Sequence, residues 1–80
     1  MNENEVKKII VTALKLEDSQ IDTNSSVDNV EEWDSLGHLG ILAALDKAFD
    51  GKIASIKEMA TADSVEKIFQ ILKENSFIES

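Results

Sequence analysis

The sequence predicts an all-α domain, a four-helix bundle of three long helices and one short helix, with a long loop between helices 1 and 2. Three amphipathic stretches repeat their apolar residues at helical spacing, and no alternating pattern is sustained long enough to form a sheet. The chain has 80 residues and no Cys. A chain of this length forms one domain with one modest core, and without disulfides it folds by packing alone.

The first helix is expected to begin near Asn2, where Glu5 stands three residues later and completes a capping box. Its apolar residues fall at i, i+3, i+4, i+7 and i+8, the spacing of one helix face: Val6, Ile9, Ile10, Ala13 and Leu14.

The second helix is expected from Asp34 or Ser35 to Phe49, with Gly51 placed to end it. The residues predicted to face inward are Leu36, Leu39, Leu42, Ala43, Leu45 and Phe49. Residues 53–59 are long enough for one or two turns of a short helix. The last helix is expected to start at a capping box of Asp63 and Glu66 and to fray near Asn75. Its apolar stripe consists of Val65, Ile68, Phe69 and Leu72.

The segment between the first two helices is rich in Asp, Asn and Ser and has no helical period. Loops of this length are uncommon inside small domains and usually carry a function. Its apolar residues, Ile21, Val27, Val30 and Trp33, are spaced like anchors that hold an irregular segment onto a core. We expect Trp33 to be at least partly buried, just before Ser35.

Charge is concentrated in the same segment. The net charge is −8, which argues against nucleic acid as a partner because phosphates are bound by clustered Lys and Arg. Seven acids and no Lys lie between residues 17 and 34: Glu17, Asp18, Asp22, Asp28, Glu31, Glu32 and Asp34. This charge either keeps a loop solvated or steers basic partner enzymes toward Ser35, and the sequence leaves both readings open.

The N-terminus is polar, and the longest apolar run is Ile41 to Leu45. We therefore expect neither a signal peptide nor a membrane span, and we take the chain to be a cytoplasmic monomer. The chain has one His, no Arg and no Cys, and therefore few of the side chains from which active sites are usually built. We expect a protein that is not itself an enzyme.

Asp34 and Ser35 are both residue types that cap a helix N-terminus. Such a terminus presents free N–H groups and a partial positive charge, which favour a linked phosphate. Leu36 is expected to begin the buried stripe and to hold Ser35 at the surface. Ser35 therefore serves either as a site of covalent modification or only as a helix cap.

The chain as a whole resembles the acyl and peptidyl carrier protein family. The likeness rests on Asp34-Ser35-Leu36 at the start of the second helix, Phe49 near its end, and Ser64-Val65 at the start of the last, together with the acidic loop. The resemblance implies that Ser35 receives 4′-phosphopantetheine from coenzyme A through a magnesium-dependent phosphopantetheinyl transferase. The thiol of that arm would then hold an acyl or aminoacyl group as a thioester. Acyl-loading and acyl-transfer enzymes are the implied partners, as in fatty acid biosynthesis.

The chain departs from the family after Ser35. Carriers of fatty acid synthesis place several acids there, whereas this chain has Gly37, His38 and Gly40, with Asp46 further on. We therefore hypothesise that partners dock across the loop and the first turn of the second helix. The candidate docking residues are Glu31, Glu32, Gly37, His38, Gly40 and Asp46. The two Gly residues share a face, which indicates either close packing against a neighbouring helix or a strip that a partner approaches. Replacing both with Ala is expected to stabilise the fold.

Three other functions compete with this reading. Asp34, Ser35 and His38 form a nominal hydrolase set, but three residues at an exposed helix start lack an oxyanion hole and a buried acid, so His38 is expected to be a surface residue. Asp22, Asn24, Ser26 and Asp28 have calcium-loop spacing, yet Val27 and Trp33 stand where that loop needs Gly and Glu. The main rival is a small acidic helical interaction module without a prosthetic group.

Overall fold

The computed structural model of the chain describes residues 1–79 and confirms an all-α protein. It has three α-helices and three short 3-10 helices, and residues 1–79 contain no strand beyond one isolated bridge. The α-helices are α1 (Glu3–Leu14), α2 (Ser35–Ala48) and α3 (Val65–Glu74). The 3-10 helices are η1 (Asp18–Gln20), η2 (Ile53–Ser55) and η3 (Lys57–Thr61).

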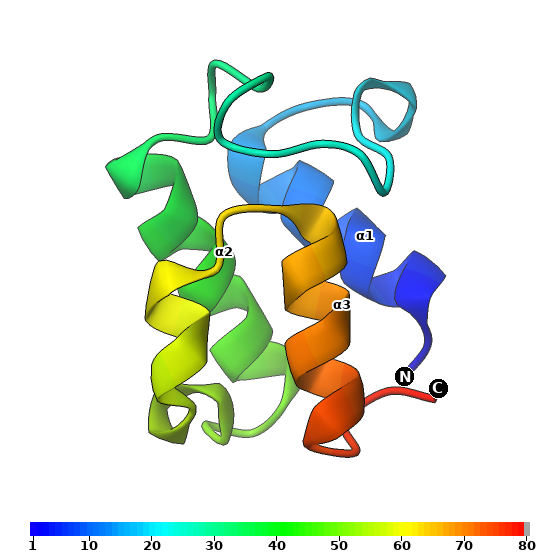
Figure 1. The fold of residues 1–80 in the computed structure, drawn as a ribbon, viewed down its shortest axis with the longest axis vertical. Helices are drawn as coiled ribbons and strands as arrows, with labels where there is room; N and C mark the ends of the chain where they lie inside the picture. The colour runs from blue at the N-terminus through cyan, green and yellow to red at the C-terminus, as the bar shows by residue number, and fades with distance from the viewer. Residues whose placement is uncertain (80) are drawn as a thin grey trace.

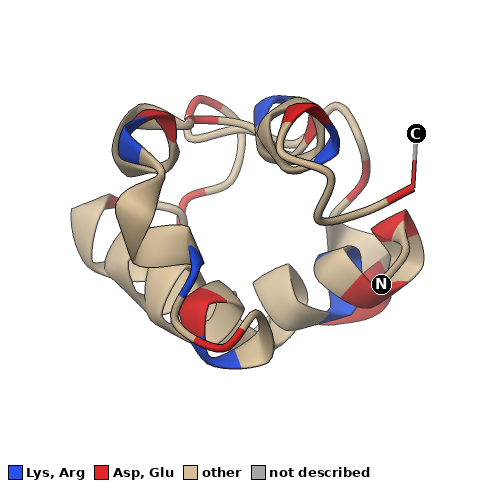
Figure 2. Cartoon of the chain, turned by 90° about the horizontal axis from the view of Figure 1, so that it is seen from below, with Lys and Arg blue, Asp and Glu red and all other residues tan. Residues whose placement is uncertain are grey.

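The helices surround a common interior. α1 packs chiefly against α2, while η2 contacts α2 and η3 contacts α3. Figure 1 shows α3 and the yellow η3 segment in front of α1 and α2, with the segment that joins α1 to α2 crossing one end of the molecule. Seen along the helices, both Lys and acidic residues occur on each of α1, α2 and α3 (Figure 2). None of the helices described over residues 1–79 has both the length and the apolar character needed to cross a membrane.

The helix starts follow local capping rules. Asn2 caps α1 by accepting from the Glu5 backbone N–H at 2.9 Å, and the Glu5 carboxylate accepts from the Asn2 N–H, which confirms the predicted capping box. The predicted box of Asp63 and Glu66 is wrong, because Ser64 is the cap of α3 and accepts from the Lys67 N–H at 3.0 Å. Ser and Asp both cap well, so local sequence did not decide between these neighbours.

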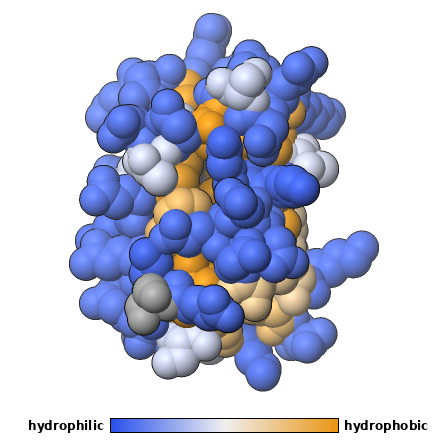
Figure 3. Space-filling view, turned by 90° about the vertical axis from the view of Figure 1, so that its right-hand side faces the viewer, coloured by the Kyte–Doolittle hydropathy of each residue, from blue (hydrophilic) through white to orange (hydrophobic). Residues whose placement is uncertain are grey.

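The core is made almost entirely of aliphatic side chains. Its fully buried members include Trp33, Ile10, Ile21, Ile41, Leu45, Met59, Ile68, Leu72, Val6 and Val65. The predicted stripe of α3 is confirmed, and so is the inward face of α1, where Ile9 and Ala13 are half-buried at its edge. On the side of the molecule that carries α1 and both termini, apolar residues form a central seam and a patch near one edge, between more numerous hydrophilic residues (Figure 3).

The inward face of α2 differs from the prediction. Ile41 and Leu45 are the buried residues of this helix, and Leu42 and Phe49 are half-buried. Leu36, Leu39 and Ala43 are exposed, so the prediction that they face the core is wrong. Most residues of α2 are apolar, and its composition therefore does not specify which side is buried.

The segment between α1 and α2 is fixed to the rest of the protein. Ile21, Val30 and Trp33 are buried as predicted, whereas Val27 is 42% exposed and does not serve as an anchor. Backbone hydrogen bonds on both sides of a bridge between Ser26 and Ser64 join this segment to the start of α3. The segment is therefore held at both its middle and its end, next to Ser35.

The chain leaves α2 through a tight turn. Gly51 has a φ of 81° and its N–H donates to the Asp46 carbonyl at 2.7 Å, which agrees with the predicted role of this glycine in ending the helix. The predicted short helix over residues 53–59 is present as η2 and η3, two 3-10 segments that meet at Ile56.

Candidate functional site

Ser35 is the first residue of α2, and its side chain is exposed. Asp34 is the cap: its Oδ1 accepts from the Gly37 N–H at 2.8 Å, and its carbonyl accepts from the His38 N–H at 2.8 Å. Asp34, and not Ser35, therefore caps the helix. Within residues 1–79 the Ser35 hydroxyl makes no side-chain hydrogen bond. Ser35 is therefore presented at the surface on a helix that a neighbouring residue stabilises.

Gly37 fixes how closely the start of α2 approaches the preceding loop. A Cβ atom on this residue would lie 2.3 Å from the Glu32 carbonyl oxygen and 2.9 Å from Leu14 Cδ2 on α1. A side chain here would push the loop and α1 away from the helix start. Close packing therefore explains Gly37, and the expectation that Ala would stabilise the fold is wrong at this position.

Gly40 is different, because a Cβ atom there would make only an ordinary contact, 3.6 Å from the Ala13 carbonyl oxygen. Of the two glycines that share a helix face, only Gly37 is required by its surroundings.

His38 is half-buried rather than a surface residue, which corrects the sequence-based expectation. Its Nδ1 lies 3.1 Å from Trp33 Nε1, and its Nε2 lies 2.8 Å from the Met59 carbonyl oxygen. Both ring nitrogens are thus occupied by structural partners. The Asp34 carboxylate caps the helix, so the nominal hydrolase set of Asp34, Ser35 and His38 does not form a catalytic array.

Two leucines beside Ser35 point to solvent. Leu36 is 78% exposed and Leu39 is 62% exposed, which corrects the prediction that Leu36 begins a buried stripe. Residues three and four apart are neighbours on a helix surface, so Leu36 and Leu39 lie together and next to Ser35. The surface formed by Leu36 and Leu39, here called the leucine surface, was missed because both residues fit a helical period.

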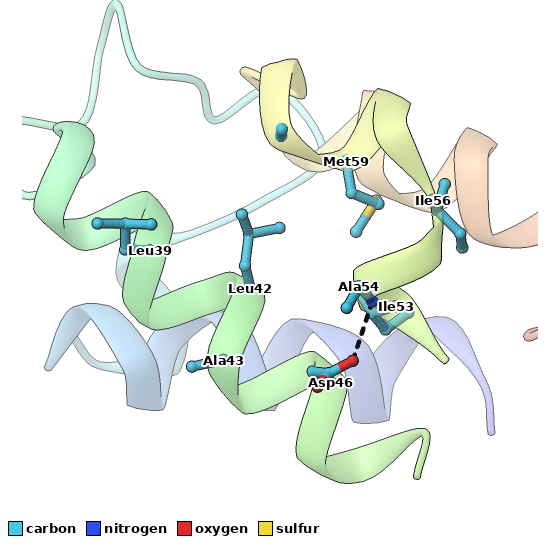
Figure 4. Close-up of a pocket in the computed structure, with 9 residues that line it drawn as sticks. Leu39, Leu42, Ala43, Asp46, Ile53, Ala54, Ile56 and Met59 are labelled. Atoms are coloured by element: carbon cyan, nitrogen blue, oxygen red, sulfur yellow. Dashed lines mark hydrogen bonds between the residues drawn. The ribbon is translucent and has the colours of Figure 1, made fainter. Parts of the chain in front are cut away.

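An apolar groove of about 340 Å³ continues from Leu39 along α2. Leu42 and Ala43 line it from α2, and η2 and η3 supply the opposite wall: Ile53, Ala54, Ile56, Met59 and Ala60. Figure 4 shows Leu42 directed toward this wall, with Leu39 at the end of the groove on the same helix.

The acidic residues of the candidate site fall into two kinds. Glu31, Glu32 and Asp34 are exposed around the helix start. Asp46, predicted to meet partners, is half-buried, and its Oδ1 accepts from the Ala54 N–H at 3.0 Å across the groove (Figure 4). Its carboxylate thus holds η2 against α2, a contact that the sequence did not predict.

The residues with calcium-loop spacing are used in turns. Asp22 Oδ1 accepts from the Asn24 N–H at 2.8 Å, and Ser26 Oγ accepts from the Asp28 N–H at 3.2 Å. These are the local turn contacts that Asp and Ser commonly make. Within residues 1–79 no group of three or more His or acidic side chains is arranged to hold a metal ion.

Comparison of the chain with protein-family models, with curated proteins and with solved structures gave no match.

Proposed function

We propose that this chain is an acyl carrier protein whose Ser35 carries a 4′-phosphopantetheine arm derived from coenzyme A. The observation that carries the proposal is the presentation of Ser35, which is exposed at the first position of α2 while Asp34 performs the capping. A serine needed only as a cap would occupy the position that Asp34 holds.

The residues around Ser35 suit an anionic attachment. The N-terminus of α2 carries a partial positive charge, and the N–H groups of the first turn favour a phosphate linked there. Asp34 engages only the Gly37 N–H through its side chain. When bound, the arm would supply the thiol that the Cys-free chain lacks, and that thiol would hold acyl groups as thioesters.

The arrangement of the helices supports the same proposal. We regard η2 and η3 together as the short fourth element of a carrier-type four-helix bundle, with residues 15–34 as its long loop. In this architecture α2 presents Ser35 at one end, and the apolar groove runs along the same helix.

Partners are proposed to be a phosphopantetheinyl transferase and acyl-loading and acyl-transfer enzymes of lipid or specialised metabolism. They would meet the leucine surface together with Glu31 and Glu32, since exposed apolar residues rimmed by charge are typical of protein-binding surfaces. His38 and Asp46 are removed from the proposed contact set because internal hydrogen bonds occupy them.

Two alternatives share some of this support. An aminoacyl or peptidyl carrier would use Ser35 in the same way, and we prefer an acyl carrier because the chain is strongly acidic. An interaction module without a prosthetic group is favoured by one observation, the exposure of Leu36 and Leu39. Such a module would need these leucines but would not need the Ser35 hydroxyl.

The test is incubation with coenzyme A, magnesium and a broad-specificity phosphopantetheinyl transferase, followed by intact-mass spectrometry. The proposal predicts a gain of one phosphopantetheine in the wild type and none in Ser35→Ala. An unmodified wild type, or a modified Ser35→Ala variant, would remove the carrier assignment.

The same assay tests the docking surface. Glu31→Lys/Glu32→Lys is expected to slow modification at least severalfold, whereas reversal of the exposed pair Glu66 and Glu74 on α3 leaves the rate unchanged. Asp46 is unsuitable as the control because its reversal would break the contact to Ala54. Equal rates for the two double variants would refute docking across the loop.

A further inference from the structure

His38 joins three parts of the protein. Its backbone lies in the first turns of α2, its Nδ1 meets Trp33 in the preceding loop, and its Nε2 meets the carbonyl of Met59 in η3. The indole and imidazole rings are nearly parallel, with an interplanar angle of 17° and centroids 6.2 Å apart. Trp33 and Met59 are each only 1% exposed, so both partners are fixed in the core.

These two contacts require one protonation state of the imidazole. The indole Nε1–H is a donor only, so Nδ1 must accept, and a carbonyl oxygen is an acceptor only, so Nε2 must donate. The neutral tautomer with its proton on Nε2 satisfies both partners. A doubly protonated ring would keep the bond to Met59 but would direct Nδ1–H at the Trp33 Nε1–H.

The surroundings offer no buried charge that would compensate an imidazolium. Among residues 1–79 the buried side chains other than hydrophobic ones are limited to Ser25. The ionisable side chains on the segments that pack against His38 are Glu31 and Glu32 in the loop, Asp34 at the helix start, and Lys57 and Glu58 on η3. All five are exposed to solvent, where their charges are screened.

The bond to Trp33 acts on the segment that leads to Ser35. Trp33 is separated from Ser35 only by the cap residue Asp34, and its ring anchors the end of the loop in the core. The bond to the Met59 carbonyl acts on η3, and the Met59 side chain lines the apolar groove (Figure 4). His38 therefore connects the presentation of Ser35 to the position of η3.

We propose that His38 is a proton-operated latch between the loop, α2 and η3. At neutral pH the imidazole holds Trp33 and Met59 together; in acid it gains a proton on Nδ1 and releases the Trp33 indole. This inference concerns the folded chain itself and does not require Ser35 to be modified.

Nitrogen-15 NMR tests the latch in the wild-type protein. The chain has one His and one Trp, so each imidazole or indole signal belongs to His38 or Trp33 without further assignment. At pH 8 the ring is expected as the Nε2–H tautomer, and the indole N–H resonance is expected to shift at the same midpoint as the imidazole on acidification. An Nδ1–H tautomer at pH 8, or an indole resonance that does not move as the imidazole titrates, would overturn the proposal.

Two variants separate the two contacts. The Oδ1 of His38→Asn stands near the position of Nδ1 and accepts from Trp33, so its indole resonance is expected to be independent of pH. The amide of His38→Gln reaches the position of Nε2 and lacks the acceptor for Trp33, so its indole resonance at pH 8 is expected at the acid position of the wild type. A full pH-dependent indole shift in both variants would show that another group drives it. The tautomer measurement decides the matter even if a variant does not fold.

Discussion

Replacing Gly37 with Ala tests whether the close approach at the start of α2 is needed for the fold. The new Cβ atom would stand 2.3 Å from the Glu32 carbonyl oxygen and 2.9 Å from Leu14 Cδ2. Overpacking of this kind costs about 1–3 kcal/mol, and the contact with backbone places it toward the upper part of that range. The better helix propensity of Ala returns about 1 kcal/mol. We therefore expect a net loss of about 1–2 kcal/mol.

Gly40→Ala is the matched control, because it makes the same chemical change three residues along the same helix. Its Cβ atom would lie 3.6 Å from the Ala13 carbonyl oxygen, an ordinary contact. The propensity gain is then unopposed, and we expect stabilisation of up to about 1 kcal/mol.

Thermal and urea unfolding followed by circular dichroism measure both variants. For a domain of this size each 1 kcal/mol moves the melting temperature by about 4–8 °C, so the two variants should melt on opposite sides of the wild type. If Gly37→Ala melts at or above the wild-type temperature, the inferred approach of Glu32 and Leu14 to α2 is incorrect.

Three further substitutions test other parts of the account by the same unfolding measurements. Asp34→Ala removes the cap of α2 and should cost about 0.5–2 kcal/mol, and Asp34→Asn should restore most of it; equal losses would contradict the cap. Asp46→Ala deprives the Ala54 N–H of its partner and should cost about 1 kcal/mol, whereas no loss would show that η2 does not depend on this contact. Leu36→Ala should change stability by less than about 0.5 kcal/mol, while Ile41→Ala, fully buried, should cost about 2–5 kcal/mol; similar losses would contradict the assignment of the leucine surface.

Where one face of a helix was clearly apolar, the sequence predicted the structure well. In α3 the stripe of Val65, Ile68, Phe69 and Leu72 is buried as expected, because the opposite face of the helix carries charged and polar residues such as Glu66, Lys67 and Gln70. In α2, Leu36 and Leu39 fit the same kind of period as the truly buried Ile41 and Leu45. Neighbouring elements decide which side of such a helix is covered, and periodicity alone does not identify them.

The sequence predicted Ser35 as the candidate site but did not predict the contacts that hold it in place. Asp34 and Ser35 are both good caps, so local preference could not assign the cap to Asp34 and leave Ser35 exposed. The roles of Gly37, His38 and Asp46 depend on atoms brought together by tertiary packing. The nearest signal in the sequence was the cost of placing a glycine inside a helix, which indicated that Gly37 needed a structural reason.

The central claim is that Ser35 is the attachment point of a phosphopantetheine arm. The most direct test is mass spectrometry of the protein purified from its native cell with any thioester kept intact, followed by cleavage after lysine. The fragment of residues 16–47 contains Ser35 and is expected to carry one phosphopantetheine, free or acylated, with the mass located on Ser35. A fragment of unmodified mass, or a modification located on Ser19, Ser25 or Ser26, would contradict the account.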